Sequence, residues 1–157
     1  MSFYIIINLF LALAWAAFLG DFSPQNLLVG SVLGYLVLFL SRRALPQSKY
    51  FEKVTKAIGF MLFFIWELLL ASLRVASDVL SPKLNMRPRV IAYKMEARTK
   101  AEIVLLSNLF TLTPGSLSLD VSSDNTVLYI HAIYAEDKEK AIESLRRLEK
   151  KLLDLLR

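Results

Sequence analysis

Three ionisable residues, Glu67, Arg74 and Asp78, stand in a mostly apolar segment that spans residues 54–80. Their spacings of seven and eleven residues place them on one face of an α-helix, because a helix turns by about 100° per residue. An ionisable side chain at the centre of a membrane helix costs about 2.5–3.5 kcal/mol. We therefore expect this face to contact protein or water, with Arg74 paired to Asp78 one turn further on.

Two roles are open for these charges. Glu67 could belong to a route for protons or other ions, because a carboxylate inside a membrane segment usually has a function. Alternatively, Glu67 is a buried anchor to a neighbouring protein, and Arg74 and Asp78 are charges at the membrane edge. The second interpretation is favoured, because one carboxylate does not make a pathway.

The sequence contains no known catalytic motif. It has no glycine-rich phosphate loop, no G-x-S-x-G, no H-E-x-x-H, no cluster of metal ligands and no cysteine. Ser116, Ser118 and Asp120 would share one strand face and could be combined with His131 into a hydrolase triad. No activating neighbour or oxyanion turn accompanies them. The sequence predicts neither an enzyme nor a site for a metal or cofactor.

The apolar residues are concentrated in the first half of the chain. Of its 157 residues, 55% are hydrophobic, which is too many for an ordinary soluble domain. Up to residue 41 the only charged side chain is Asp21, whereas charges are frequent after Lys83. The net charge of +5 comes from basic residues beside hydrophobic segments, so it indicates membrane flanks rather than nucleic acid. We predict a membrane part at 1–81, a linker at 82–88 and a polar domain at 89–157.

The membrane part contains three predicted helices, over residues 3–19, 24–41 and 54–80. Ser23 suits the N-cap and Pro24 the first position of the second helix, so the first two helices form a hairpin. We expect the first helix to be retained rather than cleaved as a signal peptide, because no basic region precedes it.

The second helix is short, and it contains a pair of small residues. Its apolar part, residues 27–40, is about 21 Å long, which is less than the ~30 Å of a bilayer core. Gly30 and Gly34 are four residues apart and would let another helix approach closely. Counting positive charges does not orient the chain, because residues 42–56 and 83–100 are both basic. A short hairpin inserted from the cytoplasmic side would place both segments in the cytoplasm.

The polar half predicts the element order βαββα. A strand is expected at 89–95, a helix after the capping box Thr99–Glu102, and a hairpin of strands at 116–122 and 126–135. The order is close to a ferredoxin-like split βαβ unit that lacks its last strand. In the second strand the alternating Leu117, Leu119 and Val121 should point to the core. An amphipathic helix begins near Asp137, with Ile142, Leu145, Leu148, Leu152 and Leu155 on its apolar face and Glu139, Glu143, Glu149 and Asp154 on its polar face.

Residues 108–121, Asn-Leu-Phe-Thr-Leu-Thr-Pro-Gly-Ser-Leu-Ser-Leu-Asp-Val, form the most specific segment. Pro114 cannot continue a helix, and Gly115 adopts dihedral angles that other residues avoid, so the chain must reverse there. Thr113 and Asp120 are short polar residues beside turns, where such side chains bond nearby backbone groups.

This segment resembles the signature of the E-type subunits of the Mrp-type multisubunit sodium/proton antiporters. The resemblance covers nearly the whole chain, including the apolar hairpin, the basic loop, Trp66-Glu67-Leu68, residues 80–84 and Arg87-Pro88. Its structural signature comprises Pro82, Pro88, Asn108, Thr111, Thr113, Pro114, Gly115 and Asp120.

The resemblance implies a seven-subunit assembly in the bacterial plasma membrane that exports sodium in exchange for protons, driven by the proton gradient. Large antiporter-like membrane subunits would be partners and would move the ions. The present chain would be a non-catalytic accessory subunit with a cytoplasmic C-terminal domain, in contact with the lipid bilayer and not with nucleic acid. The alternative is a membrane-tethered ligand-binding or regulatory module that acts independently of an antiporter.

Overall fold

A computed structural model describes residues 2–43, 49–81 and 86–157 of the chain. Its contacts divide the chain into two compact units, one up to Thr55 and one over Lys56–Arg157. The division falls within the helix α3 (Lys49–Leu80). Residues 82–85, which include Pro82 and Lys83, lie outside the described part.

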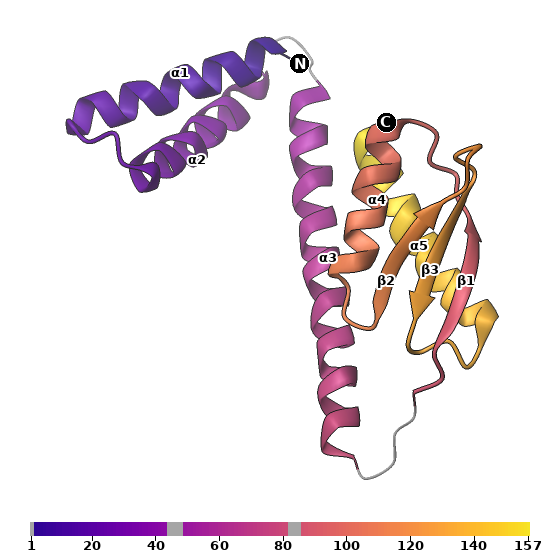
Figure 1. The fold of residues 1–157 in the computed structure, drawn as a ribbon. Coiled ribbons are helices and arrows are strands. Elements are labelled where there is room, and N and C mark those ends of the chain that lie inside the picture. Colours follow the sequence, from indigo (N-terminus) through magenta and orange to yellow (C-terminus); the bar gives the residue numbers. More distant parts are fainter. Residues whose placement is uncertain (1, 44–48, 82–85) are drawn as a thin grey trace. The chain divides into compact units, whose positions relative to one another are not determined.

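The first unit is a helical hairpin of α1 (Ser2–Leu19) and α2 (Pro24–Leu40), followed by a short 3-10 turn, η1 (Ser41–Arg43) (Figure 1). The predicted start of α2 is confirmed, because the Ser23 hydroxyl accepts a hydrogen bond from the Asn26 N–H at 3.4 Å and Pro24 is the first helical residue. Gly20 has a φ of +68°, in the left-handed region, and this conformation lets α1 end and the chain turn.

The two glycines of α2 lie against α1. A Cβ atom added at Gly30 would lie 2.9 Å from both the Cα and the carbonyl oxygen of Ala12. One added at Gly34 would meet the Asn8 amide oxygen. Ala12 is buried, whereas most large apolar side chains of the hairpin point outward. The hairpin is therefore held by close backbone approach rather than by a core of large side chains.

An aromatic cluster closes one end of the hairpin. Tyr4, Leu38 and Tyr50 are buried together, with the Tyr4 and Tyr50 rings stacked at 6.1 Å between centroids. Asn8 donates a hydrogen bond from Nδ2 to the Tyr50 hydroxyl at 2.9 Å. The first turn of α3 thus belongs to the packing of the first unit.

The second unit contains α3 from Lys56 onward and a small α+β domain. The domain has the predicted order βαββα. Its three-stranded sheet has the order β1-β3-β2, and both pairings are antiparallel. Its elements are β1 (Arg89–Lys94), α4 (Lys100–Leu112), β2 (Ser116–Val121), β3 (Val127–Ala132) and α5 (Lys138–Leu156).

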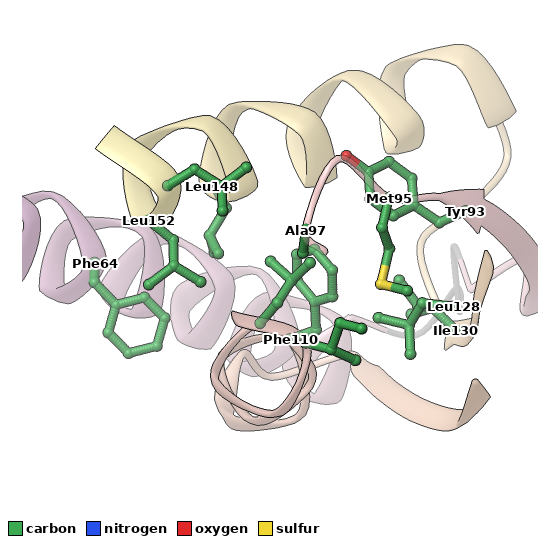
Figure 2. Packing of buried hydrophobic residues seen from close by; sticks show 12 residues of the cluster. Phe64, Tyr93, Met95, Ala97, Phe110, Leu128, Ile130, Leu148 and Leu152 are labelled. Carbon is green, nitrogen blue, oxygen red and sulfur yellow. The ribbon is translucent and has the colours of Figure 1, made fainter. Parts of the chain in front are cut away.

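The core of this unit lies on one face of the sheet, between the strands and the helices α4 and α5 (Figure 2). Tyr93 and Ile130 from the sheet meet Phe110 from α4 and Leu152 from α5. Phe64 of α3 is buried in the same cluster. Thr99 and Glu102 form the predicted capping box, which fixes the start of α4. The opposite face of the sheet carries exposed side chains, among them Val90 and Tyr129.

The orientation predicted for β2 is wrong. Leu117 and Leu119 point outward, with 47% and 51% of their surface exposed, and the serines face α4 instead. The Ser116 hydroxyl donates to the Phe110 carbonyl at 2.6 Å, and the Ser118 hydroxyl donates to the Ser107 carbonyl at 2.9 Å. The strand lies so close to α4 that short hydroxyl side chains fit there and satisfy helix carbonyl groups.

A register shift between Ser118 and Asp120 then returns Val121 to the core. The extra residue of such a bulge changes which side chains face inward, so alternation before the shift does not continue after it. The sequence had predicted that Asp120 shares a strand face with Ser116 and Ser118. The register shift places Asp120 on the other face.

Glu149 is also placed differently from the sequence prediction. It was expected on the polar face of the last helix, yet only 1% of it is exposed. Its carboxylate accepts hydrogen bonds from the Tyr93 hydroxyl at 2.6 Å and from the N–H groups of Glu96 and Ala97 at 2.8 and 2.9 Å. Burial, followed by the hydrogen bond to Glu149, raises the pKa of the Tyr93 phenol above its ordinary value.

Candidate functional site

One face of α3 contacts the α+β domain, and we call Phe60, Phe64, Glu67, Arg74 and Asp78 its domain face. These residues follow one another at steps of three, four or seven, so they share one side of the helix. Phe60 and Phe64 contribute to the core, whereas the three charged residues lie nearer the C-terminal end of the helix. The charges singled out in the sequence therefore face protein within the same chain.

Glu67 is paired with a residue of α5. Its Oε1 accepts a hydrogen bond from Nη2 of Arg147 at 2.6 Å. The side chain of Glu67 is 19% exposed and that of Arg147 is 58% exposed, so water screens the pair. A partly exposed ion pair of this kind contributes about 0.2–1 kcal/mol to stability. Its main effect is to set where α5 lies on α3.

Arg74 and Asp78 do not form the expected ion pair in the described part of the chain. The Arg74 guanidinium instead lies over the ring of Tyr134, 5.5 Å from its centroid. The reason is that Tyr134, from the segment after β3, offers Arg74 an aromatic face. Asp78 is buried, and among the described residues neither its Oδ2 nor the Tyr134 hydroxyl has a hydrogen-bond partner of good geometry. The Asp78 carboxylate is nevertheless close enough to raise the pKa of the Tyr134 phenol.

The Thr-Pro-Gly turn, residues 113–115, ends α4 beside this tyrosine. Thr113 is the C-cap, and its hydroxyl donates to the Leu109 carbonyl at 2.9 Å. Gly115 has a φ of +90°, and a Cβ atom there would lie 3.1 Å from the Tyr134 ring. Glycine is therefore favoured twice at this position, by the dihedral angle and by the close ring.

The remaining signature residues make local backbone contacts or lie at the surface. The Thr111 hydroxyl donates to the Ser107 carbonyl at 2.9 Å and accepts from the Ser118 N–H at 3.2 Å, which joins α4 to β2. Asp120 accepts the N–H of Val121 at 2.8 Å. Asn108 and Pro88 are exposed, and Pro88 directly precedes β1.

A cavity of about 530 Å³ lies where these parts meet. Glu67 and Arg74 line it from α3 and Arg147 from α5. The Thr-Pro-Gly turn after α4 and Tyr134 after β3 complete the lining. Its charged lining carries both signs, because Glu136, Asp137 and Lys140 also contribute. Among the described residues no group of three His, Cys, Asp or Glu side chains is placed to hold a metal ion.

The hydrolase arrangement that the sequence allowed is not assembled. The hydroxyl groups of Ser116 and Ser118 are bonded to main-chain carbonyls on the inner side of the sheet. His131 pairs with Leu117, whose side chain points to the outer side. The serine and histidine side chains therefore lie on opposite faces of the sheet.

Sequence reasoning did not identify Arg147, Tyr134 or Glu149. Arg147 is one of many charged residues on α5. It is 80 residues away from Glu67 in the sequence, and no local pattern predicts a contact over that separation. Tyr134 lies beyond β3 and carries no local signal either. Glu149 did have a signal, because the step of four from Leu145 and of three to Leu152 places it on the apolar side of α5.

These features define a class of membrane-associated protein: an apolar helical hairpin and a long apolar helix, followed by a small α+β domain. By length and composition one described helix, Tyr50–Leu80, could cross a membrane, and the apolar stretches Phe3–Leu19 and Pro24–Leu40 are shorter. A family model described as "Na+/H+ ion antiporter subunit" matches residues 8–155. The chain belongs to this antiporter-subunit family, as its resemblance had indicated.

Individual relatives agree with this assignment. The chain is 45% identical over 146 residues to the E-type Na(+)/H(+) antiporter subunit of Bacillus subtilis (strain 168), covering 93% of this chain and 92% of the relative. It is 39% identical over 145 residues to the E-type antiporter subunit of Alkalihalophilus pseudofirmus, with 92% of both chains covered. A chain in the structure of the Mrp complex from Dietzia sp. DQ12-45-1b is similar with a TM-score of 0.51 and 28% identity, covering 64% of this chain and 96% of that one.

Proposed function

We propose that the chain is an accessory, non-catalytic subunit of a multisubunit Na+/H+ antiporter, and that it supports assembly and ion exchange driven by the proton gradient. The family match along residues 8–155 carries this proposal. The pairing of Glu67 with Arg147 of the same chain supports it, because this carboxylate takes part in packing within the chain. The partners are the other subunits, including large antiporter-like membrane subunits.

The proposed arrangement in the bacterial plasma membrane follows the composition of the two parts. Residues 1–81 are the membrane part, with helices at about 3–19, 24–41 and 54–80, and the hairpin makes the chain multi-pass. Residues 82–88 are the linker, and residues 89–157 form the cytoplasmic domain. We assign this domain to the ferredoxin-like type without its last strand, because β1 and β2 lie on either side of β3 and both are antiparallel to it.

Glu67 has a positioning role in this proposal. Its bond to Arg147 holds α5 on α3, so the carboxylate orders the chain's own domain instead of carrying ions. An ion-route role would need a carboxylate that is open to a neighbouring ion carrier, whereas Glu67 is bonded to Arg147 of the same chain at 2.6 Å.

The test is Glu67→Gln in the whole complex, carrying a tag on the C-terminus of this chain. Co-purification in mild detergent measures assembly, and sodium-dependent proton movement in membrane vesicles measures transport. The positioning role predicts weaker recovery of the large subunits and a loss of transport in proportion to it. Normal assembly with abolished transport would instead place Glu67 on the ion route. Glu143→Gln, an exposed change on α5, is the matched control and should alter neither.

A second candidate is a tethered ligand-binding or regulatory module, and the cavity of about 530 Å³ is the observation that favours it. Its lining includes three cationic side chains and two carboxylates, which suits a small ligand that carries both charges: Arg74, Lys140, Arg147, Glu67 and Asp137. Recovery of the tagged chain alone, folded and without large subunits, would support this role against the antiporter.

A further inference from the structure

The outer face of α3 is apolar, and no described residue covers it between residues 58 and 73. We define it as Ile58, Leu62, Ile65, Trp66, Leu69 and Leu73, which lie on the side of the helix opposite to the domain face. Each of these side chains is between 45% and 65% exposed. A contiguous stripe of this kind marks a contact with lipid or with another protein.

The domain face extends over nearly the same stretch of α3 as the outer face does. Contacts with the domain run from Phe60 to Asp78, a distance of about 27 Å along the helix axis. The hydrocarbon core of a bilayer is about 30 Å thick. If α3 crossed that core with the domain in place, the domain would have to lie inside the hydrocarbon as well.

The part of the domain beside α3 cannot enter hydrocarbon. The α5 helix contacts α3, and ten of its nineteen residues are ionisable. Arg147 and Lys151 both lie over the Phe63 ring at 5.9 Å from its centroid. Charged side chains of this density are excluded from the centre of a membrane. Docking of the domain and a transverse α3 therefore exclude each other.

We infer that α3 lies along the bilayer surface, with its outer face in the lipid and its domain face toward water. A long helix with an apolar side and a charged side adopts this position because each side then meets the matching solvent. Arg147 and Lys151 lie over Phe63, at the border between the two sides of the helix, and are complementary in charge to anionic headgroups. Trp66, on the outer face, is a residue type that prefers this interfacial depth.

This position has a consequence for the sidedness of the chain. A helix in the surface plane leaves both of its ends on one side of the membrane. The basic segments before and after α3 then both lie on the cytoplasmic side. The excess of positive charge on that side is therefore consistent for the whole chain. Of the described helices, the one long enough to cross a membrane is therefore the one that does not cross it.

The test measures depth at four exposed positions of α3 in the full chain, three on the outer face and the fourth at Ala76, on the same side of the helix. The sequence contains no cysteine, so single substitutions Ile58→Cys, Ile65→Cys, Leu69→Cys and Ala76→Cys can each carry a spin label without background. The protein is placed in vesicles of phosphatidylethanolamine and phosphatidylglycerol, and collisions with oxygen and with a water-soluble nickel chelate give the depth of each label. The expected result is one shallow depth of about 5–10 Å at all four sites.

A crossing helix would place labels at Ile65 and Leu69 near the midplane and those at Ile58 and Ala76 near the two surfaces, which would overturn the inference. Labels that meet neither oxygen nor the chelate would show that protein covers the outer face, and would overturn it too. Glu143→Cys on α5 is the control, and its label should be reached freely by the chelate. Slow amide exchange of residues 127–132 in each variant verifies that the domain is folded.

Discussion

The helical hairpin and the C-terminal domain differ in which side chains face inward, small ones in the hairpin and large ones in the domain. In the hairpin the small residues face inward, with Gly30 and Gly34 against α1, and large apolar side chains such as Phe10 and Phe18 face outward. In the domain the large side chains face inward, and charged residues cover the outside of α5. The hairpin therefore fits apolar surroundings, in which helices associate by close packing, and the domain fits water.

The α3 helix shows both patterns at once, and this explains why it is difficult to classify by composition. Its outer face resembles the hairpin, because large apolar residues such as Leu62 are exposed there. Its domain face resembles the core of a soluble protein, because Phe64 is buried in the cluster with Leu152. A helix with two such sides belongs at the boundary between the two environments.

The largest effect is expected where the domain depends on a buried polar group. Glu149→Ala leaves the Tyr93 hydroxyl and the N–H groups of Glu96 and Ala97 without their acceptor. Each unsatisfied donor costs about 1–3 kcal/mol. We expect the domain to lose at least about 3 kcal/mol, which corresponds to roughly 100-fold faster amide exchange in residues 127–132 of the full chain. Amide exchange in detergent, followed by mass spectrometry, measures this directly.

Two further variants isolate the cause. Glu143→Ala changes an exposed glutamate of the same helix, and it should leave amide exchange in β3 unchanged. Glu149→Gln keeps one amide oxygen as an acceptor. Its rate of amide exchange in residues 127–132 should lie between those of Glu143→Ala and Glu149→Ala. If Glu149→Ala behaved like Glu143→Ala, the domain would not depend on its buried network. The hairpin amides should be unaffected by any of these changes, because they belong to the other unit.

A smaller effect is expected from the close contact within the hairpin. Gly30→Ala brings a methyl group to 2.9 Å from backbone atoms of Ala12, which cannot move away as a flexible side chain could. Overpacking of this kind costs about 1–3 kcal/mol. Trp15 lies beside Gly30, so its fluorescence in a Trp66→Phe background reports on separation of the helices during heating in detergent. The variant should unfold at a lower temperature than its parent.

Gly59→Ala provides the matched control for that change. Nothing lies within 4 Å of a Cβ atom at Gly59, so alanine there meets open space and favours the helix by about 1 kcal/mol. Helix propensity favours alanine at both positions, so an unfolding temperature that does not fall in Gly30→Ala would show that the contact with Ala12 does not limit the stability of the hairpin.

Local signals in the sequence predicted the elements well, because they act over a few residues. Ser23 and Thr99 cap their helices as expected, and Asp137 accepts the N–H groups of Glu139 and Lys140 at the start of α5. The chain reversal at Gly115 was equally clear, since only a few residue types adopt its dihedral angle.

Contacts between distant elements could not be predicted in the same way. Ser116 and Ser118 face inward because α4 lies close to β2, a distance that no alternation of residue types reveals. The candidate site depends on such contacts, since Arg147 and Tyr134 reach the domain face of α3 from other elements. The sequence identified Glu67 and Arg74 as unusual, but it did not reveal their partners.

The smallest expected effect is a dependence of stability on pH. It should be seen in the domain, which contains paired carboxylates, and not in the hairpin. The hydrogen bond from Arg157, supported by the N–H groups of Arg98 and Thr99, lowers the pKa of Glu102 from 4.5 to about 2. Because the folded state has the lower pKa, the stabilisation is complete above pH 4.5 and is lost as the pH falls from 4.5 toward 2. Amide exchange in α4 should therefore accelerate over this interval.

Glu102→Gln tests this origin, because glutamine can keep the capping box but cannot titrate. The part of the acceleration that comes from Glu102 should disappear in the variant, while the contribution of Asp137, whose pKa is also lowered, remains in both proteins. The hairpin supplies an internal reference, since Asp21 is the only acidic residue among residues 2–43. An identical pH dependence in the parent and Glu102→Gln would show that the ion pair with Arg157 contributes nothing to the domain. A hairpin more sensitive to acid than the domain would contradict the division of the chain into an apolar part held by close packing and a polar part held by paired charges.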